Sequence, residues 1–195
     1  MNLQTTPTLK KQLRQQIRLL RQALTAEQRL QADRLLAQQY QQHLANKQYR
    51  HLAVYIQQDG ELGTNHLIDS LFQAGCQLYL PKLNPDTSNR LQFVNYHQQS
   101  IMQNNRFGIP EPVIDDVIAV ADLELIFLPL TAFDLQGNRL GMGGGFYDRT
   151  LAHLSIKKPL LVGLAYDFQQ VTACPVESFD QPLDMILTPT RVLYP

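Results

Sequence analysis

Residues 52–80 constrain the fold more than any other part of this chain of 195 residues. Residues 52–56 are a continuous apolar run, which is typical of a strand buried on both faces. A helical apolar pattern follows at residues 64–72, and residues 77–80 predict a second short strand that ends at Pro81. A strand, a loop, a helix and a strand at this spacing form a βαβ unit, which implies parallel pairing and a right-handed crossover. We therefore expect an α/β fold.

Further segments extend the predicted sheet. Residues 123–128, 160–166 and 185–188 have the composition of short buried strands. Residues 91–96 alternate weakly and predict an edge strand or a hairpin arm. Residues 107–112 cannot be helical, because the prolines in this run restrict both themselves and the residues before them.

Two helices are predicted before the sheet. Thr25 and Gln28 match a capping box that starts the second helix, which we expect to end near Asn46. The first helix has apolar residues every three or four positions along one face, as expected of an amphipathic helix: Leu9, Leu13, Ile17, Leu20 and Leu24.

The first helix also carries a stripe of basic residues beside its apolar face: Lys10, Arg14, Arg18 and Arg21. A stripe of this kind is commonly a solvated face. Lys10 and Arg14 lie one turn apart on the same side, however, so the stripe can also be a surface that contacts phosphate. The sequence leaves both interpretations open.

The chain has no internal repeat and no linker long enough to separate independent domains. We expect a single domain over residues 1–195, with a helical segment at about 8–46 and an α/β body at about 50–195. The formal net charge is zero, which argues against nucleic acid as a partner. No apolar run approaches the roughly 20 residues that cross a bilayer, and no secretory signal is visible.

Cys76 and Cys174 are the two cysteines, and they lack the spacing of a metal or redox motif. Reduced, buried thiols in the cytoplasm fit them better than a disulfide framework. We therefore expect a cytoplasmic monomer without a membrane or nucleic-acid partner.

Four of the ten glycines lie within five residues, at Gly141, Gly143, Gly144 and Gly145. Glycine costs backbone entropy and offers no side chain to a core. A backbone that must approach an anion closely does need it, because successive N–H groups then form a cradle for phosphate oxygens. Arg139 precedes this cluster, and an apolar helical segment at residues 146–154, which carries Asp148, follows it. These features predict a phosphate or nucleotide loop with an acid that faces a metal.

Two familiar phosphate-binding motifs do not fit the cluster. A Walker A loop places a lysine and a serine or threonine after its last glycine, where this chain has Phe146 and Tyr147. A Rossmann fingerprint needs glycines at the first, third and sixth positions, but the sixth position from Gly141 is Phe146. The spacing therefore disfavours an NAD-dependent enzyme.

A second candidate loop follows the first predicted strand. Residues 57–63 lie at the carboxyl end of that strand, where ligands bind in open α/β sheets. Glu61 is the candidate functional side chain of this loop. An acid in such a loop can equally be an exposed turn residue, since loops carry both kinds of charge.

Around the glycine cluster the chain resembles the 5-formyltetrahydrofolate cyclo-ligase (methenyltetrahydrofolate synthetase) family. The signature of that family is similar to Phe-Asp-x-x-Gly-x-Arg-Leu-Gly-x-Gly-x-Gly-Tyr-Tyr-Asp, which corresponds here to residues 133–148. Four other matches occur in the expected order along the chain. They are Lys10 with residues 13–14, the Glu61 loop, residues 107–112, and Asp180 with Thr188.

The resemblance implies a three-layer α/β/α sandwich around a mainly parallel sheet, with N-terminal helices. It also implies an ATP- and Mg²⁺-dependent reaction that converts 5-formyltetrahydrofolate to 5,10-methenyltetrahydrofolate and releases ADP and phosphate. In this family the formyl oxygen attacks the γ-phosphate, and N10 of the folate then closes the ring as phosphate leaves. Phosphoryl transfer depends mostly on positioning and on neutralising charge, which the glycine cluster and its basic neighbours suit.

The resemblance further implies which residues form the site. Arg139 and Asp148 are the expected catalytic residues. Asp148 and Asp180 are the expected Mg²⁺ ligands, and two carboxylates suffice because Mg²⁺ also takes phosphate and water. The expected ATP site consists of Lys10, Arg14, Arg139, Leu140, Gly141, Met142, Gly143, Gly144, Gly145, Phe146 and Tyr147. The expected folate site consists of Ile56, Glu61, Met142, Gly143, Gly144, Gly145 and Phe146, with Glu61 as an acceptor for pterin N–H groups.

This chain departs from the family pattern inside the glycine cluster. Met142 stands where a basic or aromatic residue is common, and Gly144 stands where some members have a lysine. The neutralisation of phosphate charge should therefore depend more on Arg139 and on the basic stripe. Phe146 replaces a common tyrosine and loses a hydroxyl group.

A second departure affects the metal ligands. Phe179 precedes Asp180 where histidine is common, so Asp184 remains a rival ligand. The alternative function is a catalytically inactive regulator that binds nucleotide or folate. The presence of both candidate acids, the arginine and all the signature glycines argues against that alternative.

Overall fold

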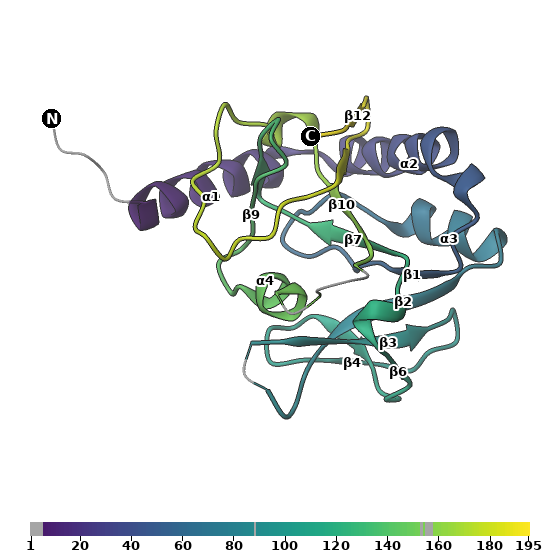
Figure 1. Ribbon diagram of the computed structural model, residues 1–195. Helices are drawn as coiled ribbons and strands as arrows, with labels where there is room; N and C mark the ends of the chain where they lie inside the picture. Colours follow the sequence, from purple (N-terminus) through teal and green to yellow (C-terminus); the bar gives the residue numbers. More distant parts are fainter. Residues whose placement is uncertain (1–5, 88, 153, 155–157) are drawn as a thin grey trace, which may run out of the picture.

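The computed structural model describes residues 6–87, 89–152, 154 and 158–195 of the chain. Two long helices, α1 (Thr6–Ala23) and α2 (Ala26–His43), come first, followed by α3 (Asn65–Gln73) and α4 (Phe146–Leu151) (Figure 1). Three short 3₁₀ turns are η1 (Ala45–Lys47), η2 (Val120–Asp122) and η3 (Asp167–Gln169). The helix predicted at residues 146–154 ends earlier, at Leu151, and residue 153 lies outside the described residues.

An eight-stranded sheet forms the centre of the described part of the chain. Its strands are β1 (His51–Ala53), β2 (Gln77–Leu83), β3 (Leu91–Tyr96), β6 (Val117–Ile118), β7 (Leu125–Pro129), β10 (Leu160–Leu164), β11 (Met185–Leu187) and β12 (Val192–Leu193). Two hairpins lie outside it, one of β4 (Met102–Asn104) and β5 (Pro110–Pro112), the other of β8 (Ala132–Phe133) and β9 (Arg139–Leu140).

The middle of the sheet is parallel. The strand order is β12-β11-β10-β7-β1-β2-β3-β6. The neighbours from β11 to β2 pair in parallel, and β12, β3 and β6 are added antiparallel at the two edges. β1, α3 and β2 form the predicted βαβ unit, with Leu52 opposite Leu78. The predicted α/β fold with a mainly parallel sheet is therefore confirmed.

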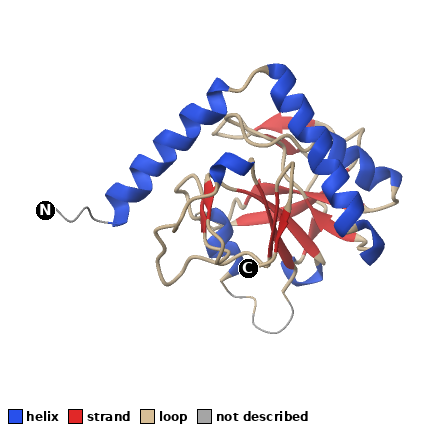
Figure 2. Ribbon diagram, turned by 90° about the horizontal axis from the view of Figure 1, so that it is seen from above, coloured by secondary structure: helices blue, strands red, loops and turns tan. Residues whose placement is uncertain are grey.

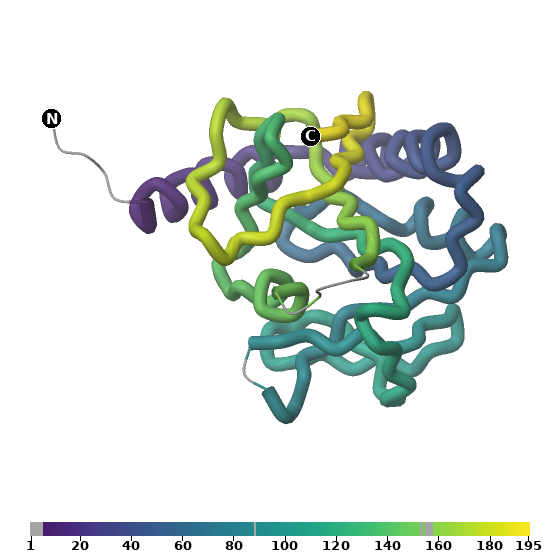
Figure 3. Tube along the Cα trace, viewed as in Figure 1, coloured from purple at the N-terminus to yellow at the C-terminus, as the bar shows by residue number. Residues whose placement is uncertain are grey.

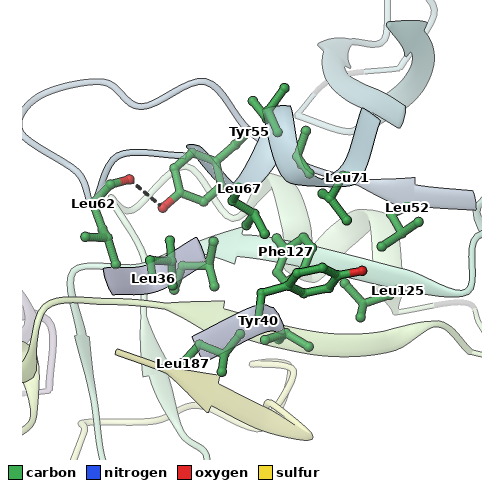
Figure 4. Close-up of a cluster of buried hydrophobic side chains, with 14 of the residues drawn as sticks. Leu36, Tyr40, Leu52, Tyr55, Leu62, Leu67, Leu71, Leu125, Phe127 and Leu187 are labelled. Carbon is green, nitrogen blue, oxygen red and sulfur yellow. Dashed lines mark hydrogen bonds between the residues drawn. The ribbon is translucent and has the colours of Figure 1, made fainter. Parts of the chain in front are cut away.

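Helices α2 and α3 cover one face of this sheet. Leu36 and Tyr40 of α2 pack with Leu67 and Leu71 of α3 and with Phe127 of β7 (Figure 4). The rings of Tyr40 and Phe127 meet edge to face with their centroids 6.1 Å apart. Both helices present apolar residues at helical spacing, which is what a helix needs in order to bury one side on a sheet.

The opposite face of the sheet is covered by shorter elements. Ile126 and Leu128 point to this side of β7 and pack with Phe133 of β8, Leu151 of α4 and Leu183. This outer layer consists of a hairpin, one short helix and irregular chain, as the tube in Figure 3 shows. No helix in the described part of the chain combines the length and the apolar character that crossing a bilayer requires.

The start of α2 follows the predicted capping box. The Thr25 hydroxyl accepts the N–H of Gln28 at 3.1 Å, and the Gln28 side chain accepts the N–H of Thr25 at 2.8 Å. These two bonds satisfy N–H groups that the first turn of a helix leaves without partners. Figure 2 shows that α1 and α2 are set at an angle to each other on either side of this cap.

The predicted apolar face of helix α1 is only partly buried. Leu9 and Leu20 are 41% and 44% exposed, whereas Lys10 and Arg21 are 8% and 0% exposed. Ile17, which lies between the two basic residues, packs against the hairpin of β8 and β9. The face that α1 turns to the body of the protein therefore combines part of the predicted apolar face, with Leu13, Ile17 and Leu24 packed inward, and part of the basic stripe.

Strand β2 continues through Pro81, where the sequence predicted that it ends. β1 pairs only with residues 77–79 of β2, and the Tyr79 carbonyl accepts the N–H of Val54. The backbone groups of residue 81 point to the same side of the strand as those of Tyr79, toward β1, but β1 does not pair beyond Tyr79. The missing N–H of Pro81 therefore costs no hydrogen bond of the sheet.

Candidate active site

The loops that follow three parallel strands meet at one edge of the sheet. Residues 54–64 follow β1, the hairpin of β8 and β9 follows β7, and residues 165–169 follow β10. The Tyr166 hydroxyl donates to the Glu61 carbonyl at 3.4 Å and so joins the first of these loops to the third. The carboxyl ends of parallel strands are where open α/β sheets bind ligands.

The hairpin of β8 and β9 is shaped by one buried carboxylate. Oδ1 of Asp134 accepts the N–H groups of Gln136 and Asn138, each at 3.0 Å, and its Oδ2 accepts the N–H of Cys174 at 2.9 Å. Gly137 has φ 80°, and a Cβ there would lie 2.7 Å from a neighbouring carbonyl oxygen. The signature residues Asp134 and Gly137 thus fix the turn that delivers β9 and the glycine cluster to the site.

The glycines of the cluster allow arginine side chains to come close to the backbone. Gly143 has φ 101°, and a Cβ there would lie 3.3 Å from Cζ of Arg14. Gly145 has φ 63°, and a Cβ there would lie 2.8 Å from Nη1 of Arg149. The loop therefore needs glycine both for its conformation and for the approach of two cations.

The first half of the basic stripe of α1 reaches this loop and the acids near the end of the chain. Nε of Arg14 donates to the Gly141 carbonyl at 2.8 Å. Nζ of Lys10 donates to Glu177 at 2.8 Å and to Asp180 at 3.0 Å. Burial lowers the pKa of Lys10, but these two carboxylates more than offset it, so its pKa is raised and the ammonium stays charged.

The second half of the stripe reaches the loop that carries Glu61. Arg18 pairs with the Asp59 carboxylate through Nε at 2.6 Å. Nη2 of Arg21 donates to the Asp59 carbonyl at 2.7 Å and contacts its carboxylate at 3.3 Å. The stripe is therefore not simply a solvated face, because each of its four cations binds a loop, although Arg18 is also exposed to solvent. Contact of the stripe with phosphate stays a prediction.

Arg139 and Asp148 form an ion pair at the two ends of the glycine cluster. Nη2 of Arg139 lies 2.6 Å from Oδ1 of Asp148, which also accepts the N–H of Gln181 at 3.1 Å. Arg139 is 6% exposed, and its buried Nε has no hydrogen-bond partner among the described residues. The two expected catalytic residues are therefore brought together, with one guanidinium N–H group unused.

Glu61 lies partly buried behind the Asp59 turn. Burial raises the pKa of its carboxyl group to about 7, although the N–H of Gln58 and the charge of Arg21 act in the opposite direction. The Gln58 N–H donates to Oε2 of Glu61 at 3.0 Å. Burial raises the pKa of the Tyr147 phenol, and the nearby charge of Glu61 raises it further. Glu61 can therefore accept or release a proton near neutral pH.

The three candidate metal ligands lie in two places. Asp148 is bonded to the backbone of Gln181, next to Asp180, whereas Asp184 accepts the Leu161 N–H at 2.9 Å at the start of β10. Asp184 thus lies at the amino end of β10, whereas the site lies at the carboxyl ends of the parallel strands. Among the residues that the structure describes, no group of three or more histidine, cysteine, aspartate or glutamate side chains could hold a metal ion without other ligands.

The remaining predicted residues contact the site in different ways. Leu140 is buried against α1, so that only its backbone can reach a ligand. Met142 is 47% exposed, and its sulfur accepts the Thr131 hydroxyl at 3.3 Å. The ring of Phe146 meets that of Phe107 edge to face, with centroids 5.9 Å apart. Ile56 is partly buried against the core under α2 and α3.

The model of the 5-formyltetrahydrofolate cyclo-ligase family matches residues 7–189. The chain belongs to this family. The cyclo-ligase of Haemophilus influenzae is 43% identical over 180 residues, which cover 91% of this chain and 96% of that protein. The cyclo-ligase of Escherichia coli K12 is 43% identical over 178 residues, which cover 90% of this chain and 98% of that protein.

Solved structures carry the same fold. The NMR structure of 5,10-methenyltetrahydrofolate synthetase from Aquifex aeolicus superimposes with a TM-score of 0.82 at 31% identity, over 95% of this chain and 92% of that one. A 5,10-methenyltetrahydrofolate synthetase from Mycoplasma pneumoniae superimposes with a TM-score of 0.75 at 24% identity, over 92% and 98% of the two chains. The family resemblance seen around the glycine cluster therefore extends over nearly the whole cyclo-ligase chain.

Sequence reasoning missed two acids of this cyclo-ligase site. Asp59 binds the second half of the basic stripe, and Glu177 binds Lys10. Both look like ordinary surface acids in polar loops. The one available signal was the number of cations in the stripe, because four basic residues on one face of a helix need partners if that face is buried.

Proposed function

We propose that this protein is an active 5-formyltetrahydrofolate cyclo-ligase, which uses ATP to close 5-formyltetrahydrofolate to 5,10-methenyltetrahydrofolate. The observation that carries the proposal is the 2.6 Å pair of Arg139 and Asp148 at the two ends of the glycine cluster. The 43% identity to the cyclo-ligases of Haemophilus influenzae and Escherichia coli K12 over nine-tenths of the chain supports the same activity. An inactive binding protein would not need both the cation and the acid at this position.

The glycine cluster is the proposed phosphate site for ATP. Backbone N–H groups of residues 141–145 provide donors, and positive φ at Gly143 and Gly145 lets neighbouring N–H groups point the same way. Arg14 lies against the loop, and Lys10 precedes it by one turn on the same helix. These two cations, together with Arg139, neutralise phosphate charge that Met142 and Gly144 cannot.

Asp148 and Asp180 are the proposed Mg²⁺ ligands. Mg²⁺ is usually held by one or two carboxylates together with phosphate oxygens and water, so two acids fit it. Each acid is paired with a cation, Asp148 with Arg139 and Asp180 with Lys10. Each pair thus offers a carboxylate to the metal and a cation to phosphate. Bound Mg²⁺ would neutralise charge on the phosphates. Asp184 bonds the backbone at the start of β10, away from Asp148, which favours Asp180 over it as the second ligand.

Phosphoryl transfer and ring closure follow in the proposed order. The formyl oxygen attacks the γ-phosphorus as the bond to the ADP oxygen breaks. N10 of the folate then attacks the activated formyl carbon, loses its proton, and phosphate leaves with the former formyl oxygen. In this proposal Arg139, which flanks the glycine cluster, stabilises negative charge on the transferred group. The contribution of the protein is mainly to position both substrates and to hold charge.

Glu61 and Ile56 are the proposed contacts to the folate. A carboxylate accepts the N–H groups of a pterin ring, and burial holds Glu61 in place while it raises its pKa to about 7. Phe146, in edge-to-face contact with Phe107, offers an aromatic wall beside the glycine cluster. The folate would thus lie between the loop after β1 and the loop after β9.

We also propose that the chain acts as a single-domain monomer. Leu36 and Tyr40 of α2 are part of the core under α3, and Ile17 of α1 is buried against the hairpin of β8 and β9. The N-terminal helices are therefore packed into the α/β body. Light scattering on purified protein should give the mass of one chain, and the mass of two chains would contradict this.

The activity is tested by a direct assay. The protein is mixed with 5-formyltetrahydrofolate and MgATP, and the near-ultraviolet absorbance of the methenyl product is followed. Product should form at a rate proportional to enzyme, with one ADP released per ring closed. Binding of both substrates without product, beside an active control enzyme, would favour the inactive regulator instead. Omission of Mg²⁺ should abolish turnover.

A further inference from the structure

Arg21 is a fully buried cation that stability alone does not explain. Its side chain is 0% exposed, and its Nε and Nη1 have no hydrogen-bond partner among the described residues. A buried charge is costly unless it is fully paired, and an apolar residue of similar size is often equally stable or better. Arg21 makes its side-chain bonds to Asp59, through Nη2 alone. The residue therefore calls for a role in that loop.

The loop that Arg21 holds has an unusual backbone. Asp59 and Gly60 both have positive φ, 49° and 71°, and such a conformation persists in a non-glycine residue only when its surroundings enforce it. Arg18 pairs with the Asp59 carboxylate, and Arg21 donates to the Asp59 carbonyl. Arg29 of α2 donates to the Arg21 carbonyl at 2.6 Å, and a Cβ at Gly60 would lie 2.8 Å from its Nη1. Three arginines therefore surround one turn.

This turn leads directly into Glu61. The N–H of Glu61 donates to the Gln58 carbonyl at 2.9 Å, and the N–H of Gln58 donates to the Glu61 carboxylate at 3.0 Å. These two bonds close a small ring around Asp59 and Gly60. A change in the conformation of Asp59 must therefore change the direction of the Glu61 carboxylate.

We propose that Arg21 is a positioning residue for the folate: it holds the Asp59 turn so that the Glu61 carboxylate faces the pterin ring. This inference rests on the proposed function, in which Glu61 contacts the folate. Arg21 itself touches neither substrate, and its effect is confined to the loop after β1. The ATP side of the site depends on Lys10 and Arg14, which lie nearer the start of α1.

Two variants test this role without a large risk of unfolding. Arg21→Met removes the buried charge and keeps an unbranched apolar side chain, and Asp59 keeps Arg18 as a partner and some solvent contact. Asp59→Asn keeps the shape and tolerates the positive φ that asparagine adopts more readily than most residues. Arg34→Gln, at an exposed position of α2, is the control for the loss of one positive charge.

Steady-state kinetics separate positioning from a merely structural effect. Loss of a charge-assisted hydrogen bond to the turn should raise the KM for 5-formyltetrahydrofolate roughly 10- to 100-fold in both variants. The KM for ATP should stay as in the wild type. The melting temperature of Arg21→Met should be equal to that of the wild type or higher. Equal increases in both KM values, or a lower melting temperature without any change in the folate KM, would overturn the inference.

The pH profile provides a second readout. The charged and titratable groups that surround Glu61 are Arg21 of α1, Asp59 of its own loop, and Tyr55, Tyr147 and Tyr166. Arg21 lowers the pKa of Glu61 and Asp59 raises it. The acid limb of kcat/KM for the folate should therefore move to higher pH in Arg21→Met and to lower pH in Asp59→Asn. Shifts in the same direction would contradict the proposed geometry.

A measurement without substrate separates this inference from the proposed function. Amide hydrogen exchange of the full-length protein should be faster at residues 58–62 in Arg21→Met and in Asp59→Asn than in Arg34→Gln. If the wild type forms no methenyl product but these amides still exchange faster, the function is wrong and the turn is held as described. If the wild type is active and exchange does not change in the variants, the positioning role is wrong.

Discussion

Nε of Arg14 donates to the carbonyl of Gly141 at 2.8 Å, across 127 positions of sequence. The bond joins the N-terminal helix to the first residue of the glycine cluster. Because the peptide bond is planar and trans, the N–H of Met142 points away from Arg14. The N-terminal helix therefore helps to hold the glycine cluster, which is the proposed phosphate loop.

Replacement of Arg14 by glutamine should weaken ATP binding more than folate binding. The variant loses a charge near the phosphates and the bond to Gly141, so we expect the KM for ATP to rise roughly 10- to 100-fold. Lys11→Gln changes the charge of the same helix at an exposed position and should leave the KM unchanged. Matching effects of the two variants would mean that only the net charge of α1 matters.

Replacement of Gly143 by alanine should damage ATP binding beyond its cost in stability. Positive φ makes a side chain there unfavourable by about 1–3 kcal/mol, and the new Cβ would push against Arg14 at 3.3 Å. Gly75 has φ 76° with nothing within 4 Å of a Cβ. Gly75→Ala should therefore lower the melting temperature to a similar extent and keep the KM for ATP. The comparison fails if both variants lose affinity for ATP equally.

Asp148→Asn should lower kcat at least about 100-fold, because it removes a carboxylate from the charged centre of the reaction. Asp184→Asn removes an acid that caps the start of β10 at the far edge of the sheet, and it should keep the wild-type kcat with some loss of stability. Asp180→Asn should raise the Mg²⁺ concentration at which activity is half-maximal. Mg²⁺ titrations of initial rate check all three, and an inactive but folded Asp184→Asn would restore it as a ligand.

The raised pKa of Glu61 predicts two pH dependences of opposite sign. The ionised carboxylate is the form that accepts pterin N–H groups, so kcat/KM for the folate should fall as the pH drops through about 7, and Glu61→Gln should lose this limb. Stability changes the other way. Because the folded pKa lies above the unfolded one, the folded protein binds more protons between about 4.5 and 7, and Glu61 makes it less stable as the pH rises through that window.

Thermal melts measure the second effect. Glu61→Gln should melt at a higher temperature than the wild type at pH 8. The difference should disappear below a pH of about 4.5, where the Glu61 carboxyl group is protonated in both the folded and the unfolded wild type. A difference that does not depend on pH would mean that the carboxyl group ionises normally in the folded protein.

The fold could be predicted from local patterns, and its exceptions have physical causes. The βαβ unit was visible because a buried parallel strand must be apolar on both faces. The apolar face of α1 is confirmed for Ile17 and wrong for Leu9 and Leu20. Lys10 and Arg21 are buried beside it, because a cation can be buried when a carboxylate or carbonyl receives it. Nothing in the local sequence of α1 reports that Asp59 or Glu177 will be there. The end of β2 was missed since a proline is tolerated where no ladder bond is made.

The site could be predicted only as far as its chemistry is written in one stretch of sequence. The signature at residues 133–148 contains both members of the Arg139 and Asp148 pair. The partners that complete the site come from residues 10–21, 57–63 and 177–181, and only the fold brings them together. The family resemblance provided Lys10, Glu61 and Asp180, but not Asp59, whose importance appears only in its contacts with α1.

The basic stripe of α1 also sets a length. Lys10 binds the acids at residues 177–180, Arg14 binds Gly141, and Arg18 and Arg21 bind Asp59 in the loop after β1. The distance between these segments is therefore spanned by turns of a single helix. Each residue of an α-helix advances the chain by about 1.5 Å and rotates it by about 100°. Deletion of one residue between Arg14 and Arg18 would turn one pair of cations away from its partners while the other pair stayed in place. Only insertions or deletions of about a whole helical turn would keep all four cations on the same face. Natural changes in the length of this helix should therefore come in steps of three or four residues.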